Sequence, residues 1–364
     1  MERVASFELF DIGDAHVHFR QDKRKKDGVI QRTDLLSFSV PLTACWASFS
    51  LPMPNTTPSV QTGFDAIKYE RQIKRASDGY SMYVIKCIKA VEGFTTPEVI
   101  REAKAKRVDA IKIYFEGMTT NANKGDAVTW EGFFNMADVW KTCAEVDMVI
   151  SVHFEKPGVF CLDREYEAIR EALVWLAELC PNARIVAEHI TDHRSLEIIN
   201  SLPENVRYTS TAHHLWGDLD LVIGGSLNAH AFCKPVLKYP MDCKALRYDA
   251  FRKGSKAMFG SDTAPHPLED KECEGCAGAF TGPYCVQMIA TILLREGYSL
   301  PEIKAIMQSY MGIRARYFYR VPRPGRKATL VRQKMTIPTI LHAETGFPVV
   351  PFQAGSELEF SLAV

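Results

Sequence analysis

The sequence lacks a net charge, a long hydrophobic run and, near its start, an apolar core of signal-peptide length. Its 364 residues include 44 lysines and arginines and 44 aspartates and glutamates, so nothing indicates a polyanionic partner such as nucleic acid. No window approaches the roughly 20 apolar residues that a membrane span requires. Glu2 and Glu8 stand where a signal peptide would need an apolar core. We therefore expect a cytoplasmic protein that binds neither nucleic acid nor a membrane.

The cysteines do not form a recognisable disulfide framework or zinc ribbon. There are ten of them, and because we expect no secretory signal, they predict reduced thiols. Cys273 and Cys276 have the spacing of half a zinc ribbon, but no second pair of this spacing completes four ligands. We interpret them as a loop feature. The basic run 23–26 has no interleaved aromatic residues, and we expect a solvated loop there.

What the sequence does contain is a regular alternation of apolar, β-prone runs with amphipathic helical patterns. Helix starts are marked by Thr96-Pro97 and Thr129-Trp130, which supply a capping hydroxyl. We expect strands at 8–19, 43–53, 80–88, 109–114, 147–154, 184–190, 206–213 and 257–262. We expect helices at 62–77, 96–106, 130–145, 162–180, 193–201, 242–253, 283–295 and 300–317.

This pattern predicts an α/β protein whose fold is a (β/α)8 TIM barrel. No low-complexity linker divides the chain, so we expect one domain over residues 1–364. The barrel would occupy about 8–320. A small C-terminal extension with its own short strands would occupy about 328–364.

Polar side chains stand at the expected carboxyl ends of seven of the eight strands. In a TIM barrel these ends converge on one mouth, where active sites are found. The pattern therefore predicts a single polar site built from most of the chain. Its candidate residues, in strand order, are His16, His18 and Arg20, then Asn55, Lys112, His153, Glu188 with His189, His213 with His214, and Asp262 with His266.

The ligand-type residues in this set are suited to zinc. They exceed what one tetrahedral ion needs but fall short of two ions that each keep an open position. A buried lysine can lose its proton, and a neutral Lys112 amine that reacts with carbon dioxide would become an anionic, carboxylate-like bridge. Pairing of Lys112 with a nearby acid is an equal alternative. The ligand-type residues are His16, His18, His153, His189 and Asp262.

The order and spacing of these residues resemble the amidohydrolase superfamily and, within it, the monofunctional dihydroorotases of bacterial and fungal type. The resemblance extends from residue 8 to about residue 355. The motifs that carry it are His16-x-His18-x-Arg20, Met53-Pro54-Asn55, Lys112-Ile-Tyr114, His153, Glu188-His189-Ile-Thr191, Asp262-x-Ala-Pro-His266 and Gly275-Cys-Ala-Gly278.

The resemblance implies the reversible cyclisation of N-carbamoyl-L-aspartate to L-dihydroorotate in de novo pyrimidine (UMP) biosynthesis, by a homodimer with two zinc ions per chain. His16, His18 and Asp262 would bind one ion, and His153 and His189 the other. Lys112, carboxylated to N6-carboxylysine, would bridge them together with a hydroxide that acts as the nucleophile. Asp262 would also be the general acid and base.

The resemblance further implies how the substrate is bound. Its α-carboxylate would contact three side chains, its pyrimidine ring two backbone groups, and a mobile lid at 116–125 would close over it. The two glycines and polar content of this loop fit a lid independently. These residues are Arg20, Asn55 and His266 for the carboxylate, Lys234 and Ala277 for the ring, and Thr119 and Thr120 for the lid.

Two alternatives remain at this point. A hydantoinase or dihydropyrimidinase would act on substrates that need no ring carboxylate, so Arg20 and Asn55 argue against it. A non-catalytic scaffold barrel would be expected to have lost metal ligands, whereas all six expected positions are filled. His213, His214 and His230 have no ligand role in the motif, and we expect each to be structural.

Overall fold

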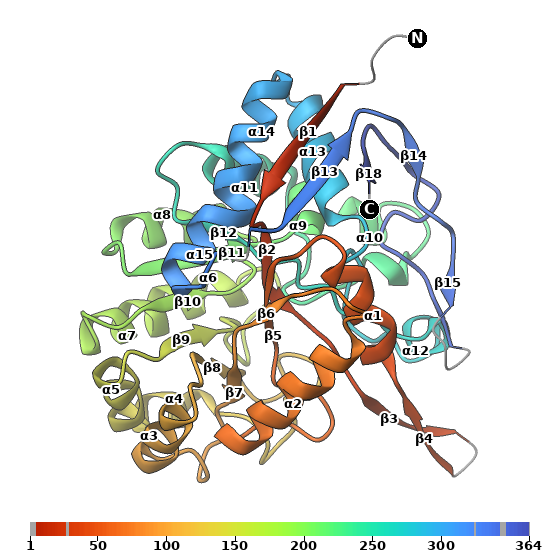
Figure 1. The fold of residues 1–364 in the computed structure, drawn as a ribbon. Helices are drawn as coiled ribbons and strands as arrows, with labels where there is room; N and C mark the ends of the chain where they lie inside the picture. Colours follow the sequence, from red (N-terminus) through yellow and green to blue (C-terminus); the bar gives the residue numbers. More distant parts are fainter. Residues whose placement is uncertain (1–4, 27–28, 324, 343–346, 364) are drawn as a thin grey trace.

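The computed structural model describes residues 5–26, 29–323, 325–342 and 347–363 (Figure 1). Within them, two parallel sheets carry eight strand positions in chain order. One sheet has the order β2-β5-β6, and the other β7 through β12. The strands are β2 (Gly13–Val17), β5 (Phe49–Pro52), β6 (Tyr83–Val84) with β7 (Cys87–Lys89), β8 (Ala110–Ile113), β9 (Val149–Val152), β10 (Ile185–Ala187), β11 (Val206–Ser210) and β12 (Ala257–Phe259).

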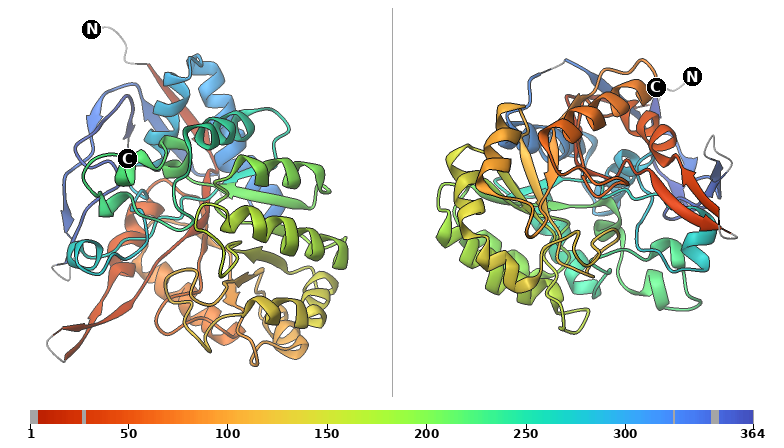
Figure 2. Two further views of the ribbon diagram at one scale, coloured as in Figure 1. Left: turned by 180° about the vertical axis from the view of Figure 1, so that it is seen from behind. Right: turned by 90° about the horizontal axis from the view of Figure 1, so that it is seen from below.

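Backbone contacts join the two sheets into a barrel. On one side, β6 of the first sheet and β7 of the second sheet follow each other in the chain, with only residues 85 and 86 between them. On the other, Val17 forms a parallel bridge with Thr263, and the Asp262 N–H donates to the His16 carbonyl at 2.8 Å. Helices surround the strands (Figure 2). The TIM barrel prediction is confirmed, although several expected strands are shorter than predicted.

The helices that follow the strands begin where the capping residues predicted. The Thr96 and Thr129 hydroxyls accept hydrogen bonds from backbone N–H groups in the first turns of α3 and α4. The helical segments are α1 (Leu35–Ala44), α2 (Gly63–Ala76), α3 (Pro97–Ala105), α4 (Trp130–Asn135), α5 (Ala137–Glu145), α6 (Arg164–Ala168), η1 (Ile169–Leu173), α7 (Val174–Leu179), α8 (His193–Ser201), α9 (Ala212–Trp216), α10 (Asp220–Ile223), η2 (Ala229–Ala231), α11 (Pro240–Phe251), α12 (Leu268–Glu272), α13 (Cys285–Arg295), α14 (Leu300–Gln308), η3 (Ser309–Ile313) and α15 (Arg314–Tyr319).

Two expectations at the N-terminal end of the chain were wrong. The run 8–19 is two strands, because the chain turns at Asp11, where φ is +51°, and β1 (Ser6–Phe10) leaves the barrel. The basic run is not a loop: β3 (Asp22–Lys26) pairs antiparallel with β4 (Val29–Thr33). The β-prone residues after the run supply its partner strand.

The barrel interior positions the polar site. Ala110 belongs to the inner apolar cluster, whereas Ile111 and Ile113 pack outward in the larger core. Because side chains alternate along a strand, Lys112 points inward like Ala110 and stands two residues nearer the carboxyl end. Phe318 and Tyr319 of α15 belong to the same inner cluster. The interior is thus apolar except towards the mouth.

The C-terminal extension pairs with the start of the chain. β13 (Lys327–Val331) lies between β1 and β18 (Ser361–Ala363) in an antiparallel sheet. Two further pairs are β14 (Met335–Thr336) with β17 (Glu357–Leu358), and β15 (Leu341–His342) with β16 (Pro348–Val349). The division into one domain with these limits stays a prediction. No helix in the described ranges combines the length and apolarity needed to cross a membrane.

Candidate active site

Two histidines at the end of β2 and an aspartate after β12 form one buried ligand set. His16 Nε2 and His18 Nε2 lie 3.2 and 2.9 Å from Asp262 Oδ1. One ligand atom of each residue lies within 4.8 Å of the others, and all three residues are buried. Gly260 permits this approach, since a Cβ there would stand 2.7 Å from the His16 Cβ. Two imidazole nitrogens and one carboxylate oxygen are a zinc-type set.

A second pair of histidines adjoins the first set. His153 and His189 follow β9 and β10, and His153 Nδ1 lies 2.9 Å from His189 Nε2. The rings of His16 and His189 are 5.1 Å apart between centroids. Burial and the neighbouring His153 hold the pKa of His189 well below its ordinary value, so the ring is neutral and offers a lone pair. The five predicted ligands are therefore brought together.

Lys112 is fully buried, and its Nζ has no hydrogen-bond partner among the described residues. Burial lowers the pKa of Lys112 to about 8, against the raising effect of the Glu188 and Asp262 charges. The predicted alternative, an ion pair with a nearby acid, is not found in the described part of the chain. The neutral form of this amine is therefore more populated near physiological pH than that of an exposed lysine.

Two carboxylates form hydrogen bonds with the predicted histidine ligands, and the sequence analysis assigned no role to either of them. Glu188 Oε2 lies 2.8 Å from His16 Nδ1, and its other oxygen accepts from the Ser151 hydroxyl. Glu155 Oε2 lies 2.7 Å from His153 Nε2. Acids of this kind fix the tautomer of a ligating imidazole. The sequence had marked Glu188 as a polar residue at a strand end without assigning it a role, whereas the signal for Glu155 was its position two residues after His153.

An anion-binding group lies beside the ligands. Arg20 Nη1 donates to His266 Nε2 at 2.9 Å, and Asn55 Oδ1 lies 2.9 Å from His18 Nδ1. Arg20 is buried, and its Nε has no partner among the described residues. Burial and the Arg20 charge hold the pKa of His266 well below its ordinary value. A buried guanidinium with donor capacity to spare is suited to a carboxylate.

The predicted lid contacts this group. The Asn55 amide donates to the Thr120 carbonyl at 3.1 Å, and the Thr120 hydroxyl donates to the Ala277 carbonyl at 3.4 Å. Buried Lys89, which sequence reasoning missed, donates to the Asn121 carbonyl at 2.8 Å and to Asp126 at 2.7 Å. The loop is thereby anchored to the barrel strand β7.

One cavity joins most of the predicted residues. Four predicted residues are not part of its lining, but each contacts a lining residue or is its neighbour in the sequence. They are Lys112, Asn55, Thr120 and His266. Lys271, also missed from the sequence, donates to the carbonyls of Cys276 and Gly278 and so holds the Ala277 segment. The lining consists of His16, His18, Arg20, Tyr114, Thr119, His153, His189, Lys234, Asp262, Ala264, Ala277 and Gly278.

Two of the ligands have strained backbones. His189 and Asp262 have φ values of +42° and +46°, in the left-handed region that residues with a side chain rarely adopt. Strain of this kind costs of order 1–3 kcal/mol and concentrates at functional sites. His189 stands two residues after β10 and Asp262 three residues after β12, at the mouth.

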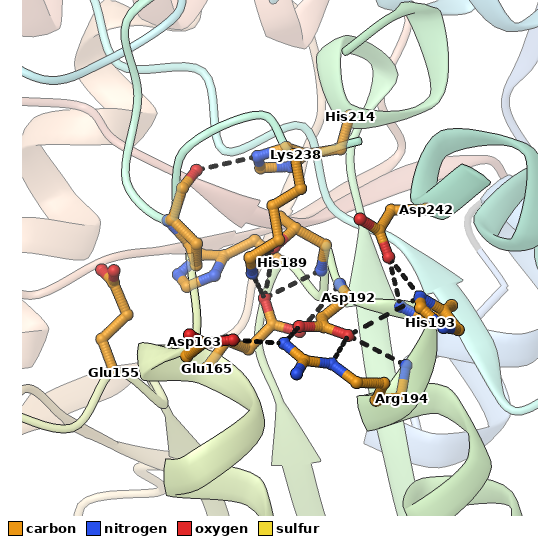
Figure 3. Close-up of polar contacts among 12 residues, drawn as sticks. Glu155, Asp163, Glu165, His189, Asp192, His193, Arg194, His214, Lys238 and Asp242 are labelled. Carbon is orange, nitrogen blue, oxygen red and sulfur yellow. Dashed lines mark hydrogen bonds and ion pairs between the residues drawn. The ribbon is translucent and has the colours of Figure 1, made fainter. Parts of the chain in front are cut away.

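A second buried charged cluster, centred on Glu165, stands close to His189 (Figure 3). Glu165 accepts from the backbone N–H groups of Thr191 and Asp192 at 2.9 and 3.0 Å, and forms an ion pair with Lys238 at 3.3 Å. Asp192 in turn accepts from Arg194 at 2.7 Å. This cluster satisfies its charges internally.

No protein-family model matches the chain, but individual proteins do. It is 30% identical to a dihydroorotase from Helicobacter hepaticus over 359 residues, which is 98% of both chains. The crystal structure of a dihydroorotase from Campylobacter jejuni aligns with a TM-score of 0.87 and 28% identity, covering 100% of this chain and 99% of that one. A Saccharomyces cerevisiae dihydroorotase in complex with 5-fluoroorotic acid aligns with a TM-score of 0.86 and 27% identity, over 99% of both chains.

Proposed function

The chain belongs to the dihydroorotase family, and from this premise we propose that it interconverts N-carbamoyl-L-aspartate and L-dihydroorotate in pyrimidine biosynthesis. The observation that supports this most directly is one cavity in which zinc-type ligands adjoin a buried arginine. His16, His18 and Asp262 supply the first group, and Arg20 the second. Such a site can polarise a cyclic amide while it holds a carboxylate on the same ring.

The buried donors fit two zinc ions. His16, His18 and Asp262 would hold one, and His153 and His189 the other. The fit is supported by buried atoms without hydrogen-bond partners in the described residues, among them His189 Nδ1 and Lys112 Nζ, because such atoms are costly to bury. When bound, paired ions supply a hydroxide nucleophile at neutral pH and polarise the carbonyl that it attacks.

Lys112 would supply the anionic bridge as N6-carboxylysine. The neutral Nζ attacks the carbon of carbon dioxide, a C–N bond forms, and the amine releases one proton. The product carries one negative charge in place of an ammonium, which removes the repulsion between a lysine cation and two metal ions. The lowered pKa of Lys112 favours this reaction because only the neutral amine reacts.

Asp262 would move the proton. Burial alone would raise the pKa of Asp262, but the adjacent His16 and His18 hold this pKa well below its ordinary value. The carboxylate is therefore charged and can accept a proton. In hydrolysis it takes a proton from the nucleophile and delivers it to the departing ring nitrogen. In cyclisation the carbamoyl nitrogen gives its proton to Asp262, which passes it to the departing oxygen. Cyclisation takes up one proton overall, so its equilibrium shifts towards dihydroorotate as the pH falls.

The substrate contacts would come from the residues around the cavity. Arg20 would bind the α-carboxylate with two N–H groups, helped by the Asn55 amide and by His266. The backbone of Lys234 and Ala277 would bind the pyrimidine ring. Thr119 and Thr120 would contact the substrate from the lid.

Assembly and location complete the proposal. A cytoplasmic homodimer is what the family resemblance implies, and all ten cysteines are free, as expected in a reducing compartment. Size-exclusion chromatography with light scattering would measure the mass directly, and a mass of one chain would contradict the homodimer.

The direct test combines two measurements on one purified sample, namely metal content and the ultraviolet absorbance assay of dihydroorotate hydrolysis. At least two zinc ions per chain, together with turnover, is the expected result. Two zinc ions without turnover would overturn the substrate assignment, and a panel of hydantoins and dihydropyrimidines would then identify the amide. A protein that neither binds zinc nor turns over after zinc and bicarbonate are supplied would be a scaffold barrel.

A further inference from the structure

A separate group of metal-ligating atoms lies after β11, outside the set assigned to the active site. One ligand atom each of His213, His214 and Cys233 lies within 4.8 Å of the other two, and all three residues are buried. The carbonyl oxygen of Pro235 is 3.0 Å from His214 Nε2 and 3.3 Å from Cys233 Sγ. Two imidazoles, one thiol and one carbonyl therefore converge.

His213 is the residue that this arrangement leaves without a partner. Its side chain is fully buried, and neither Nδ1 nor Nε2 has a hydrogen-bond partner in the described ranges. Its ring packs against Phe352, at 5.9 Å between centroids, and against His214 at 4.3 Å. A buried polar group left unsatisfied costs about 1–3 kcal/mol. Burial also keeps the pKa of His213 well below its ordinary value, so the ring is neutral.

The spacing of the donors fits a tetrahedral ion. Bonds of about 2.3 Å to sulfur and 2.0–2.1 Å to nitrogen, at a tetrahedral angle, place the two atoms about 3.6 Å apart. His214 Nε2 and Cys233 Sγ are 3.6 Å apart. The other nitrogen of His214 lies 2.9 Å from the Thr211 hydroxyl, which is the support that a ligating imidazole usually has.

We propose that His213, His214 and Cys233 bind a third zinc(II) ion, with the Pro235 carbonyl completing the coordination. Binding releases the Cys233 thiol proton to solvent. The His214 proton moves from Nε2 to Nδ1, and the resulting Nδ1–H donates a hydrogen bond to the Thr211 hydroxyl oxygen. The ion links α9 to the segment that carries Lys234, and so fixes that segment against the barrel.

Cobalt(II) substitution of the holoenzyme tests this independently of turnover. Thiolate-bound cobalt absorbs in the near ultraviolet by charge transfer, and the set assigned to the active site contains no sulfur. We expect the band in the wild-type protein and in the matched control Cys143→Ser, which removes another buried thiol. We expect no band in Cys233→Ser. In His213→Gln, cobalt affinity should fall at least tenfold and zinc content should fall by one ion per chain.

Three results would overturn the proposal. The first is a folded wild-type protein that shows no band. The second is a band that survives Cys233→Ser but disappears in Cys273→Ser, since that would assign it to Cys273 and Cys276. The third is a His213→Gln variant with unchanged cobalt affinity and zinc content, which would mean that His213 is satisfied by water. Thermal melting establishes whether each variant is folded. If Cys233→Ser does not fold, the cobalt affinity and zinc content of His213→Gln test the proposed site instead.

Discussion

Two buried clusters of ionisable side chains stand close together at the barrel mouth, and they differ in how their polar atoms are satisfied. In the cluster centred on Glu165, the carboxylate has two backbone donors and an ion pair with Lys238 (Figure 3). In the cluster of Arg20, His189 and Lys112, each residue leaves a buried nitrogen without a hydrogen-bond partner among the described residues.

The difference distinguishes buried ionisable groups that stabilise the fold from buried ionisable groups that bind a ligand. Burying an unpartnered polar group lowers the stability of the folded protein, so a protein that keeps several of them at one place keeps them for a ligand. The Glu165 cluster needs no ligand, and we expect it to act only on stability. Substitutions in and around the two clusters test this contrast.

The largest effect is expected at Asp262. Replacing it with alanine removes both a metal ligand and the proton carrier, so turnover should fall by at least about 10³-fold. Thermal melting should show a folded protein, because His16 keeps its contact with Glu188 and His18 keeps its contact with Asn55. Hydrolysis of dihydroorotate at a wild-type rate in Asp262→Ala would remove this residue as the acid and base.

Lys112→Ala should lose zinc and, with it, turnover. The matched control is Lys89→Ala, since Lys89 is also a buried lysine and stands directly opposite Lys112 in the β7–β8 pairing. Lys89 already has Asp126 as its partner, so its loss should disturb the lid without changing zinc content. Plasma mass spectrometry of both variants measures this, and full occupancy without Lys112 would exclude the carbamate bridge.

Arg20→Ala should weaken substrate binding rather than the metal centre. Truncating one member of a buried charged pair costs about 2–5 kcal/mol, so KM should rise about 30-fold or more while zinc content stays at the wild-type value. A comparison of dihydroorotate with dihydrouracil, which lacks the carboxylate, supplies the control. A wild-type preference for dihydroorotate in the variant would contradict the assigned role.

The smallest effect on activity is expected in the Glu165 cluster. Glu165→Gln leaves Lys238 as an unpaired buried cation, so the free energy of unfolding should fall by about 3–5 kcal/mol. Turnover and zinc content should change by no more than a few-fold. Urea unfolding and the absorbance assay measure the two quantities. Adding Lys238→Met should restore part of the stability, and a large loss of zinc in either variant would break the contrast between the clusters.

The sequence indicated the barrel and the ligands because both follow from order along the chain. Parallel strands all end at the same mouth, so a polar residue after each apolar run is enough to predict that His16, His153, His189 and Asp262 meet. The strand and helix limits were less accurate, as the turn at Asp11 shows, because local propensity does not reveal which strand a segment will pair with.

The tertiary structure alone decided which groups satisfy one another. Glu188 is 172 residues from His16, to which it bonds, and His214 is 19 residues from Cys233. Side chains come within 3 to 4 Å of each other only when the backbone is placed to that accuracy, and no spacing in the sequence specifies this. Residue types at strand ends therefore determined what chemistry the chain can perform. Packing decided which polar atoms are paired for stability and which are left for a ligand.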